Sequence, residues 1–327
     1  MVELHERVEA VSARTELEEL RRRGMPTGGV IVRIEGIPDA MVTNPSVPFP
    51  CDGETVLAVR ADPGGELPGS RSVFCRCGAD GIWRPVAGAP ELQLEDPFVA
   101  FIKGQLVLGG VRVIREGDRI VSWVTDFYRG TGLRDLQRFA TGPSHMKDIR
   151  LVELADGRLG VFSRPQGQKV MERCGCIAKI GFTVVEDLDH LTAEAIEAAP
   201  FLEGTFLPEE WGGANQAYLL ANGLIGVIGH KAWGEHTDGV HVLHYYSMAF
   251  AVDPRTRRLT PTKLIAAREC FEDGPTLSPR TRDVTFTAGI VRLPGGRAEL
   301  WTGLSDLRVG RIGIDDPLAE YEAIGTC

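Results

Sequence analysis

The chain lacks any long hydrophobic run. None of the apolar stretches among its 327 residues approaches the roughly 18 residues that a membrane span requires. The N-terminus is rich in charged residues and lacks the apolar segment of a signal peptide. We therefore expect a cytoplasmic protein without a membrane partner.

The chain also lacks a surplus of positive charge. Its 36 Lys and Arg residues are outnumbered by 45 Asp and Glu residues, which gives a formal net charge of −9. Surfaces that bind nucleic acid are usually basic, so no nucleic-acid partner is expected. None of the tryptophans is followed by aspartate, whereas scaffolds of the tryptophan-aspartate type carry that dipeptide in many repeats. A non-enzymatic scaffold is an alternative that this absence disfavours.

Cysteines are too few for a disulfide framework. There are seven, an odd number, and none has the Cys-x-x-Cys spacing that is usual in zinc sites. Two Cys-x-Cys pairs, Cys75/Cys77 and Cys174/Cys176, would together supply four thiolates for zinc, but alternating strand residues have the same spacing. We expect free thiols, no metal and no cofactor.

The first 25 residues predict a helical extension. Helical periodicity covers residues 2–23, and two apolar faces follow each other along this segment. The faces are formed by Leu4, Val8 and Val11, and by Ala10, Ala13, Leu17 and Leu20. Gly24 and Pro26 end the helix. One face can cover the rest of the chain and the other a second copy, so we expect a homodimer. A second helix is expected at residues 190–202.

Most of the remaining chain predicts strands separated by Gly, Pro and Asp. Five stretches resemble one another, since each has a short polar residue, a strand, a Gly-containing turn and a second apolar strand. The polar residues are Asn44, Asp96, Asp148, Asn215 and Asp283, which are 52, 52, 67 and 68 residues apart. Such spacing is typical of β-propeller blades. We predict an all-β, five-bladed β-propeller over residues 26–327, preceded by the N-terminal helix.

Equivalent residues of the blades would converge on the central channel. The five polar residues would form a ring there, with Arg60, Arg164 and His230 on the next strands close by. Asn and Asp also cap strand ends, but five at equivalent positions favour a site. The stretch 145–165 adds Lys147 and Arg150 beside Asp148 and Arg164. Arg suits phosphate through its bidentate fork and Lys as a point charge.

Five motifs follow in an order similar to that of glycoside hydrolase family 130, the β-mannoside phosphorylases, which are five-bladed propellers. They are Asn44-Pro45 with Arg60, Glu95-Asp96-Pro97, Lys147-Asp148 with Gly157 and Arg164-Pro165, the strand ending in His230, and the segment from Gly303 to Asp306. The chain departs from that family at Phe98, where Arg is usual, at Ile149-Arg150, and at Lys231, where Gly is usual. It resembles more closely a sister group, glycosyltransferase family 108. That group includes β-1,2-mannan phosphorylases and mannosyltransferases that use mannose 1-phosphate or GDP-mannose.

The resemblance implies an enzyme that carries out inverting phosphorolysis or synthesis of β-mannosides, with β-1,2-mannooligosaccharides as the expected substrates. Its partners would be a mannose-containing oligosaccharide and phosphate, mannose 1-phosphate or GDP-mannose. Asp96 would be the proton donor. Asn44, Asp148, Asn215, Asp283 and Asp306 would bind the sugar, and Arg60, Lys147, Arg150, Arg164 and His230 would bind phosphate. The alternative is a glycoside hydrolase, which needs a second carboxylate as base, with Asp306 or Asp283 available.

Overall fold

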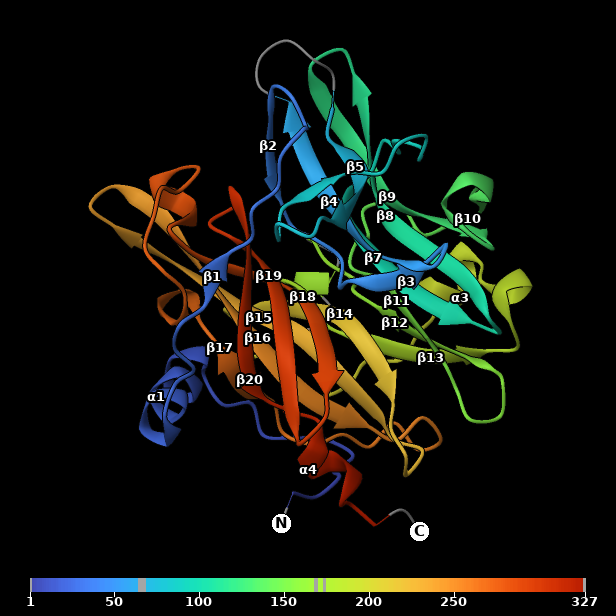
Figure 1. Ribbon diagram of the computed structural model, residues 1–327. Coiled ribbons are helices and arrows are strands. Elements are labelled where there is room, and N and C mark those ends of the chain that lie inside the picture. The colour runs from blue at the N-terminus through green and yellow to red at the C-terminus, as the bar shows by residue number, and fades with distance from the viewer. Residues whose placement is uncertain (1, 64–68, 168–169, 173–174, 326–327) are drawn as a thin grey trace.

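The structure is a computed structural model that describes residues 2–63, 69–167, 170–172 and 175–325. Strands form most of it, and the few helices are short and lie on the outside (Figure 1). Within the described residues, none of the helices combines the length and the apolar character that crossing a membrane would take. The predicted strand-rich class and the predicted helix near the N-terminus are confirmed.

The first half of the chain forms three separate antiparallel sheets. The first contains β2 (Ala40–Thr43), β3 (Phe49–Cys51), β4 (Glu54–Pro63), β5 (Arg71–Cys77) and β6 (Trp83–Pro85). The second contains β7 (Glu95–Ile102), β8 (Gln105–Glu116), β9 (Arg119–Gly130) and β10 (Gln137–Thr141). The third contains β11 (Arg150–Glu153), β12 (Leu159–Ser163) and β13 (Gly181–Val185). We call these sheets units one to three.

The second half forms an eight-stranded sheet made of two antiparallel units. Unit four contains β14 (Trp211–Leu219), β15 (Ile225–Thr237), β16 (Val240–Val252) and β17 (Lys263–Ala266). Unit five contains β18 (Asp283–Leu293), β19 (Arg297–Leu304), β20 (Arg308–Asp315) and the N-terminal strand β1 (Val30–Ile31). Two parallel residue pairs between β16 and β18 join the units. Because β1 pairs with β20, the beginning of the chain completes the last unit.

Tight turns join the long strands of each unit. Lys103-Gly104, between β7 and β8, and Asp238-Gly239, between β15 and β16, have positive φ at both positions. Two-residue hairpin turns of type I′ require this conformation. Between neighbouring units, apolar side chains form the core. Phe98 and Phe127 of unit two, for example, pack in one buried cluster with Leu151 and Val161 of unit three.

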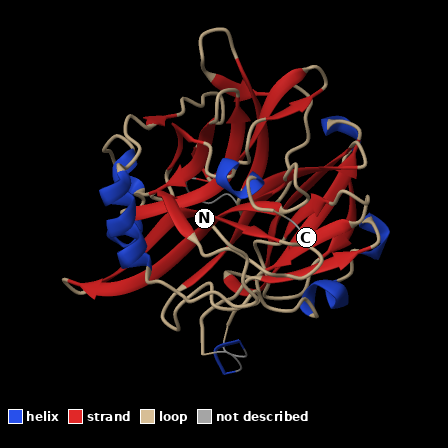
Figure 2. Ribbon diagram, turned by 90° about the horizontal axis from the view of Figure 1, so that it is seen from below, coloured by secondary structure: helices blue, strands red, loops and turns tan. Residues whose placement is uncertain are grey.

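The N-terminal helix α1 (Ala13–Arg23) is shorter than the sequence predicts. Residues 2–12 are not helical, so that part of the prediction is wrong. There, His5 bridges to Leu259 and the Val8 N–H donates to Glu203 O at 3.2 Å, so the backbone bonds to other segments instead of to itself. Ser12 caps α1 by accepting from Thr15 N at 3.1 Å. The helix lies along the outside of unit four, beside β17 (Figures 1 and 2).

The other helical segments are single turns. The helix expected at residues 190–202 is reduced to α3 (Ala193–Glu197), which follows the 3₁₀ turn η2 (Leu188–His190) and ends before Pro200. Other short segments are α4 (Ala319–Glu322) and the 3₁₀ turns η1 (Leu133–Asp135), η3 (Arg268–Cys270) and η4 (Pro279–Thr281).

Candidate functional site

Residues from all five units line one pocket of about 170 Å³. Eight of the eleven residues predicted for the site lie there, and they come from segments far apart in the sequence. They are Asn44, Arg60, Asp96, Lys147, Asp148, Arg164, His230 and Asp306. The repeat thus brought most of the predicted residues together, and we call this cavity the central pocket.

Three of the polar residues that begin the repeats share an unusual backbone conformation. Asn44, Asp96 and Asp148 have φ angles of 39°, 49° and 57°. Asp306 has a φ of 53°. Asn and Asp enter this left-handed region several times more readily than most residues with a side chain. The conformation therefore explains why a short polar residue occupies these positions.

The Asp96 carboxylate is buried and held by two donors. Asn44 Nδ2 donates to Asp96 Oδ1 at 2.8 Å, and Arg60 Nη1 lies 3.1 Å from the same oxygen. Burial raises the pKa of Asp96, but Arg60 and Lys147 outweigh it and hold the pKa below its ordinary value. In the ligand-free protein, Asp96 is therefore ionised at neutral pH.

Two other carboxyls near Asp96 have a raised pKa instead of a lowered one. Burial, reinforced by the negative charge of Asp96, raises the pKa of both Glu95 and Asp306. Arg60 opposes this shift at both groups, and its Nη1 lies 3.3 Å from Glu95 Oε2. The site therefore holds carboxyls with different proton affinities side by side, which is the arrangement that acid–base chemistry uses.

Asp148 forms the second anionic group of the pocket. Its Oδ2 lies 3.1 Å from Arg164 Nη1. Burial raises the pKa of Asp148, but Arg164 and Lys147 lower it to about 2. Neither carboxylate oxygen accepts a hydrogen bond with good geometry from the described residues. These oxygens are therefore available to donors of a ligand, such as sugar hydroxyls.

Two of the cations differ in how firmly they are fixed. Arg164 Nε donates to Gly212 O at 2.7 Å, and Arg164 Nη1 donates to Gln166 Oε1 at 2.7 Å. Lys147 lines the same pocket, and no carboxylate of the described residues lies within ion-pair distance of its ammonium. The pocket thus combines a preoriented guanidinium with a point charge that no carboxylate of the described residues holds.

His230 is neutral in this environment. Burial, aided by nearby cations, lowers its pKa to about 3. Its Nδ1 donates to Asn215 Oδ1 at 2.7 Å, so the other ring nitrogen, Nε2, carries the lone pair. Nε2 is buried and has no partner among the described residues. The Tyr245 ring stacks on the imidazole with centroids 5.4 Å apart.

Two predicted residues lie behind the pocket instead of lining it. Asn215 is 1% exposed and acts on the pocket through His230. Arg150 Nε donates to Asn215 O at 2.7 Å, and its guanidinium lies 4.3 Å from the centre of the Phe98 ring. The structure therefore does not place Asn215 or Arg150 in direct contact with a ligand of the central pocket.

Asp283 lies outside the central pocket, so its expected place in the polar ring is wrong. Its Oδ2 accepts from His244 Nδ1 at 2.6 Å and from the Tyr246 hydroxyl at 3.1 Å. The three residues line another cavity, next to α1.

The expected position of the fifth repeat is shifted along the chain. In the first four repeats the turn glycines Gly53, Gly104, Gly157 and Gly223 follow the polar residue by eight or nine positions.

In the fifth repeat, Gly295 follows Asp283 by twelve positions. The turn of this repeat has a second glycine, Gly296, and the residue eight positions before it is Ala288. The register shift of β18 also lies there, between Thr287 and Gly289. Unit four has the corresponding shift around Asn215, between Ala214 and Gln216. Ala288 is therefore the structural equivalent of Asn215, and the spacing to the turn would have revealed it.

Asp62 and Tyr245 are two of the residues that line the central pocket but were not predicted from the sequence. Asp62 Oδ1 accepts from Arg60 Nε at 2.7 Å. Since residues two apart in a strand share a face, the position of Asp62 after Arg60 was a usable signal. Tyr245 was missed because nothing distinguishes it from its neighbours in a long apolar strand.

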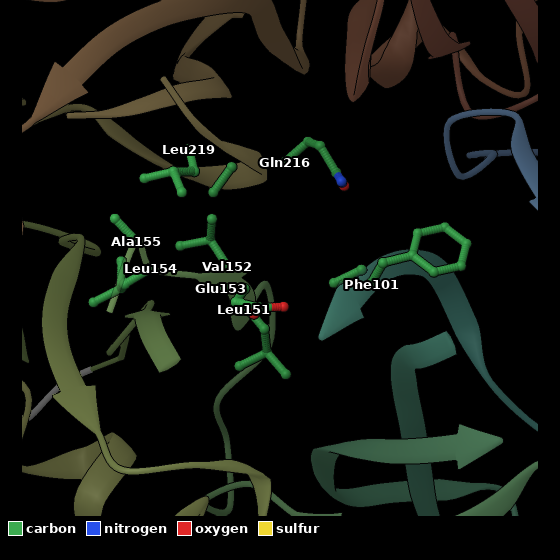
Figure 3. Close-up of a pocket in the computed structure, with 10 residues that line it drawn as sticks. Phe101, Leu151, Val152, Glu153, Leu154, Ala155, Gln216 and Leu219 are labelled. Carbon is green, nitrogen blue, oxygen red and sulfur yellow. The ribbon is translucent and has the colours of Figure 1, made fainter. Parts of the chain in front are cut away.

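A larger cavity, of about 480 Å³, lies between the other ends of β7, β11 and β14. Figure 3 shows Phe101 and Leu219 on either side of it. Glu153 is the charged residue among those that line it, and its Oε2 already accepts from Lys103 N at 2.6 Å. This cavity therefore lacks the groups for the chemistry that the central pocket offers.

Among the described residues, no group of three or more His, Cys, Asp or Glu side chains is placed to hold a metal ion. Cys75 is buried and Cys77 is exposed, although both lie on β5. Cys176 is buried, and Cys174 lies outside the described residues.

The chain matches the family described as "Protein of unknown function (DUF1861)" over residues 21–320. No curated protein matches it by sequence. It is similar to the solved structure of MPT-4, a mannose phosphorylase from Leishmania mexicana, in complex with phosphate ion. The identity is 34%, the alignment covers 95% of this chain and 96% of that chain, and the TM-score is 0.87.

The chain is also similar to MPT-1, a GDP-Man-dependent mannosyltransferase from Leishmania mexicana. The identity is 32%, with 96% of each chain covered and a TM-score of 0.85. A β-1,2-mannobiose phosphorylase from Listeria innocua is 13% identical, with 88% of this chain and 94% of that chain covered and a TM-score of 0.64. That likeness shows a shared fold alone. The resemblance predicted from the five motifs is confirmed.

Proposed function

Because the chain belongs to the DUF1861 family and shares the fold of the two Leishmania mannose enzymes, we propose that it is a mannoside phosphorylase. The observation that carries the proposal is the presence of Arg60, Lys147 and Arg164 beside Asp96 in one pocket. An inverting phosphorylase needs one proton donor together with cations that hold phosphate. An inverting hydrolase needs a second carboxylate to activate water.

The reaction can be written with the residues of the pocket. A phosphate oxygen attacks the anomeric carbon of a β-mannoside while the bond to the glycosidic oxygen breaks. Asp96 gives its proton to that leaving oxygen, and the products are α-mannose 1-phosphate and the shortened saccharide. Lys147 and Arg164 hold phosphate, Arg as a fork and Lys as a point charge. In the synthetic direction the same steps run in reverse.

Binding of phosphate prepares Asp96 for this role. In the ligand-free pocket, cations keep Asp96 ionised, and an ionised carboxylate has no proton to donate. A phosphate dianion beside Lys147 offsets that field and raises the pKa of Asp96. Asp96 thus takes up a proton when phosphate binds, and the acid is formed only in a loaded site.

The remaining pocket residues suit a sugar. The Asp148 carboxylate, which lies beside Arg164 but accepts no hydrogen bond from the described residues, accepts hydroxyl protons of the sugar. A neutral His230 offers no positive charge, so we assign its Nε2 lone pair to the hydroxyl of a singly protonated phosphate. Asn44 and Asp306 complete the polar lining.

The test is to incubate the protein with a β-1,2-mannooligosaccharide, with and without inorganic phosphate. We expect mannose 1-phosphate to form only when phosphate is present. Free mannose released at the same rate without phosphate would favour the hydrolase. That alternative needs Asp306 as an ionised base, and burial raises its pKa, which opposes the role.

A GDP-mannose-dependent mannosyltransferase is the second candidate, and the similarity to MPT-1 favours it. The same acceptor supplied with GDP-mannose or with mannose 1-phosphate separates the two donors. Elongation with GDP-mannose but not with mannose 1-phosphate would replace the phosphorylase by the transferase.

We also propose that the five units are the blades of a five-bladed β-propeller, which forms one catalytic domain over residues 26–327 behind an N-terminal extension of residues 1–25. Two features support this: each unit is an antiparallel sheet, and all five contribute to the central pocket. An experimental structure that lacks five radially arranged sheets would contradict it.

A homodimer formed through the N-terminal segment is also retained as a proposal. Helix α1 buries Leu17 and Leu20 on its own chain, so a second copy would contact the outer side of the segment, where Val11 is 36% exposed. Light scattering should give twice the mass of the chain, and a monomeric mass would reject the dimer.

A further inference from the structure

His230 and Lys231 are neighbours on β15, and their side chains lie on opposite faces because successive strand residues alternate. His230 lines the central pocket. Lys231 is fully buried on the other face, at the position where glycoside hydrolase family 130 usually has Gly. Lysine is almost never fully buried unless it is paired, so the partners of Lys231 indicate its role.

Three oxygens surround the Lys231 ammonium. Nζ donates to Val11 O at 2.5 Å and lies 3.5 Å from Glu16 Oε2, and both of these residues belong to the N-terminal segment. Glu210 Oε2 is also 3.5 Å away. We call Lys231, Glu16 and Glu210 the rear cluster; none of the three is more than 3% exposed.

Glu210 connects the rear cluster to β14. Its Oε1 accepts from Ala13 N, the first residue of α1, at 2.5 Å, and its Oε2 accepts from Leu207 N at 3.1 Å. A carboxylate at a helix N-terminus is also favoured by the helix dipole. The next residue, Trp211, begins β14. The N-terminal segment therefore fixes where β14 starts.

The start of β14 supports the cationic side of the central pocket. Gly212 O accepts from Arg164 Nε at 2.7 Å, and Asn215 Oδ1 accepts from His230 Nδ1 at 2.7 Å. A Cβ on Gly213 would lie 2.8 Å from Arg164 Cδ. Since β14 and Arg164 pack this closely, a displacement of β14 would move Arg164 and the partner of His230 together.

We propose that Lys231 is a positioning residue through which the N-terminal segment sets the geometry of Arg164 and His230 for phosphate. This inference rests on the proposed function. Stabilisation alone would not require these charges, because replacing a buried ion pair by well-packed apolar residues often leaves a protein as stable or more stable. The hydrogen bond to Val11 O and the ion pairs with Glu16 and Glu210 instead fix the position of β15 relative to α1 and β14.

The experiment compares Lys231→Met, Lys231→Arg and a matched control, Lys263→Met. Lys263 on β17 is also a lysine paired with a carboxylate, Glu320, and it lies outside the central pocket. We expect Lys231→Met to weaken binding of inorganic phosphate about tenfold in calorimetry, the scale of one hydrogen bond to a charged group. The KM for the mannoside should change less than about twofold. Lys231→Arg should recover most of the affinity, and Lys263→Met should change neither constant.

A second readout does not depend on phosphate. In protein with ¹⁵N-labelled histidine, the His230 signals, assigned through His230→Gln, should show one tautomer with the proton on Nδ1. They should not titrate between pH 5 and 8, because burial lowers the His230 pKa to about 3. Lys231→Met should mix the two tautomers. If Lys231→Met does not fold, Glu16→Gln takes its place, with a loss of phosphate affinity of about threefold.

The two readouts separate the proposals. Wild-type protein that binds no phosphate would end the proposed function, while the His230 tautomer would still decide the positioning role. A folded variant with wild-type phosphate affinity and unchanged His230 signals would overturn the positioning role. Equal losses of phosphate and mannoside affinity would also overturn it, since they would indicate a general structural defect.

Discussion

Two groups of buried charges, one in the central pocket and one in the rear cluster, lie on opposite faces of β15. The pKa of Asp96 and Asp148 is lowered in the first group, and the pKa of Glu16 is raised in the second. In the central pocket, burial raises the pKa of Asp96 and Asp148, but nearby cations outweigh it and both pKa values fall below the ordinary range. In the rear cluster, burial prevails over Lys231 and raises the pKa of Glu16 to about 7. The pocket holds three cations, whereas the rear cluster holds one between two carboxylates.

The difference shows how the same residue types serve two purposes. The pocket keeps fixed positive charge beside ionised carboxylates and leaves polar atoms without partners, as a site for an anion and a sugar requires. In the rear cluster one cation lies among three oxygens of the protein itself. A buried charge therefore indicates ligand binding when several cations face a cavity, and positioning when the charge contacts only groups of its own chain.

The largest expected effect is on the acid of the central pocket. Asp96→Asn keeps an acceptor for Asn44 and removes the proton, so turnover should fall by roughly 10²–10⁴, the scale of general-acid catalysis. Steady-state kinetics with thermal melting measures this. Asp62→Asn is the matched control, since it also removes a carboxylate beside Arg60, and it should cost much less. Full activity of Asp96→Asn would remove the catalytic assignment.

The second expected effect is on the cations of the central pocket. Arg164→Gln should weaken phosphate binding by roughly 10–100-fold, because a charge-assisted contact is lost, and should change mannoside binding less. Lys147→Gln should act in the same direction. Arg158→Gln, on the same hairpin but paired at the surface with Asp156, is the control and should leave both unchanged. Equal losses for phosphate and mannoside would contradict the assignment.

The third prediction concerns the rear cluster and pH. A carboxyl whose pKa is raised on folding binds its proton more tightly in the native state, so its contribution is present below its unfolded pKa and is lost as pH rises through the folded value. For Glu16 the window runs from pH 4.5 to about 7. The free energy of unfolding should therefore fall across this window by about 3 kcal/mol on account of Glu16.

Urea unfolding at several pH values measures this slope. Glu16→Gln should flatten it, and Glu19→Gln, an exposed position on the same helix, should not. An identical slope in the Glu16→Gln variant would mean that Glu16 is ionised in the folded protein, and the contrast between the two faces of β15 would disappear.

Sequence reasoning found the repeated units and most of the central pocket, because polar residues before a strand and glycines in its turn leave a periodic signal. It could not separate residues that line the pocket from residues one layer behind it, such as Arg150 and Asn215, since both kinds are polar and buried. The rear cluster was not predicted at all. Glu16, Glu210 and Lys231 are far apart in the sequence, and only packing of α1 on β15 brings them together.

The smallest expected effect is at Asp283, which tests the corrected alignment of the fifth repeat. Its carboxylate accepts from His244 and Tyr246 beside α1 and does not line the central pocket. Asp283→Asn should therefore leave kcat and both KM values within about threefold of wild type and lower the free energy of unfolding by about 1 kcal/mol, because one partly buried acceptor is weakened. Asp148→Asn is the contrasting variant and should lose mannoside affinity by at least about tenfold, since its oxygens face the ligand. If both variants lose mannoside affinity equally, Asp283 reaches the sugar and the polar ring of five residues is restored.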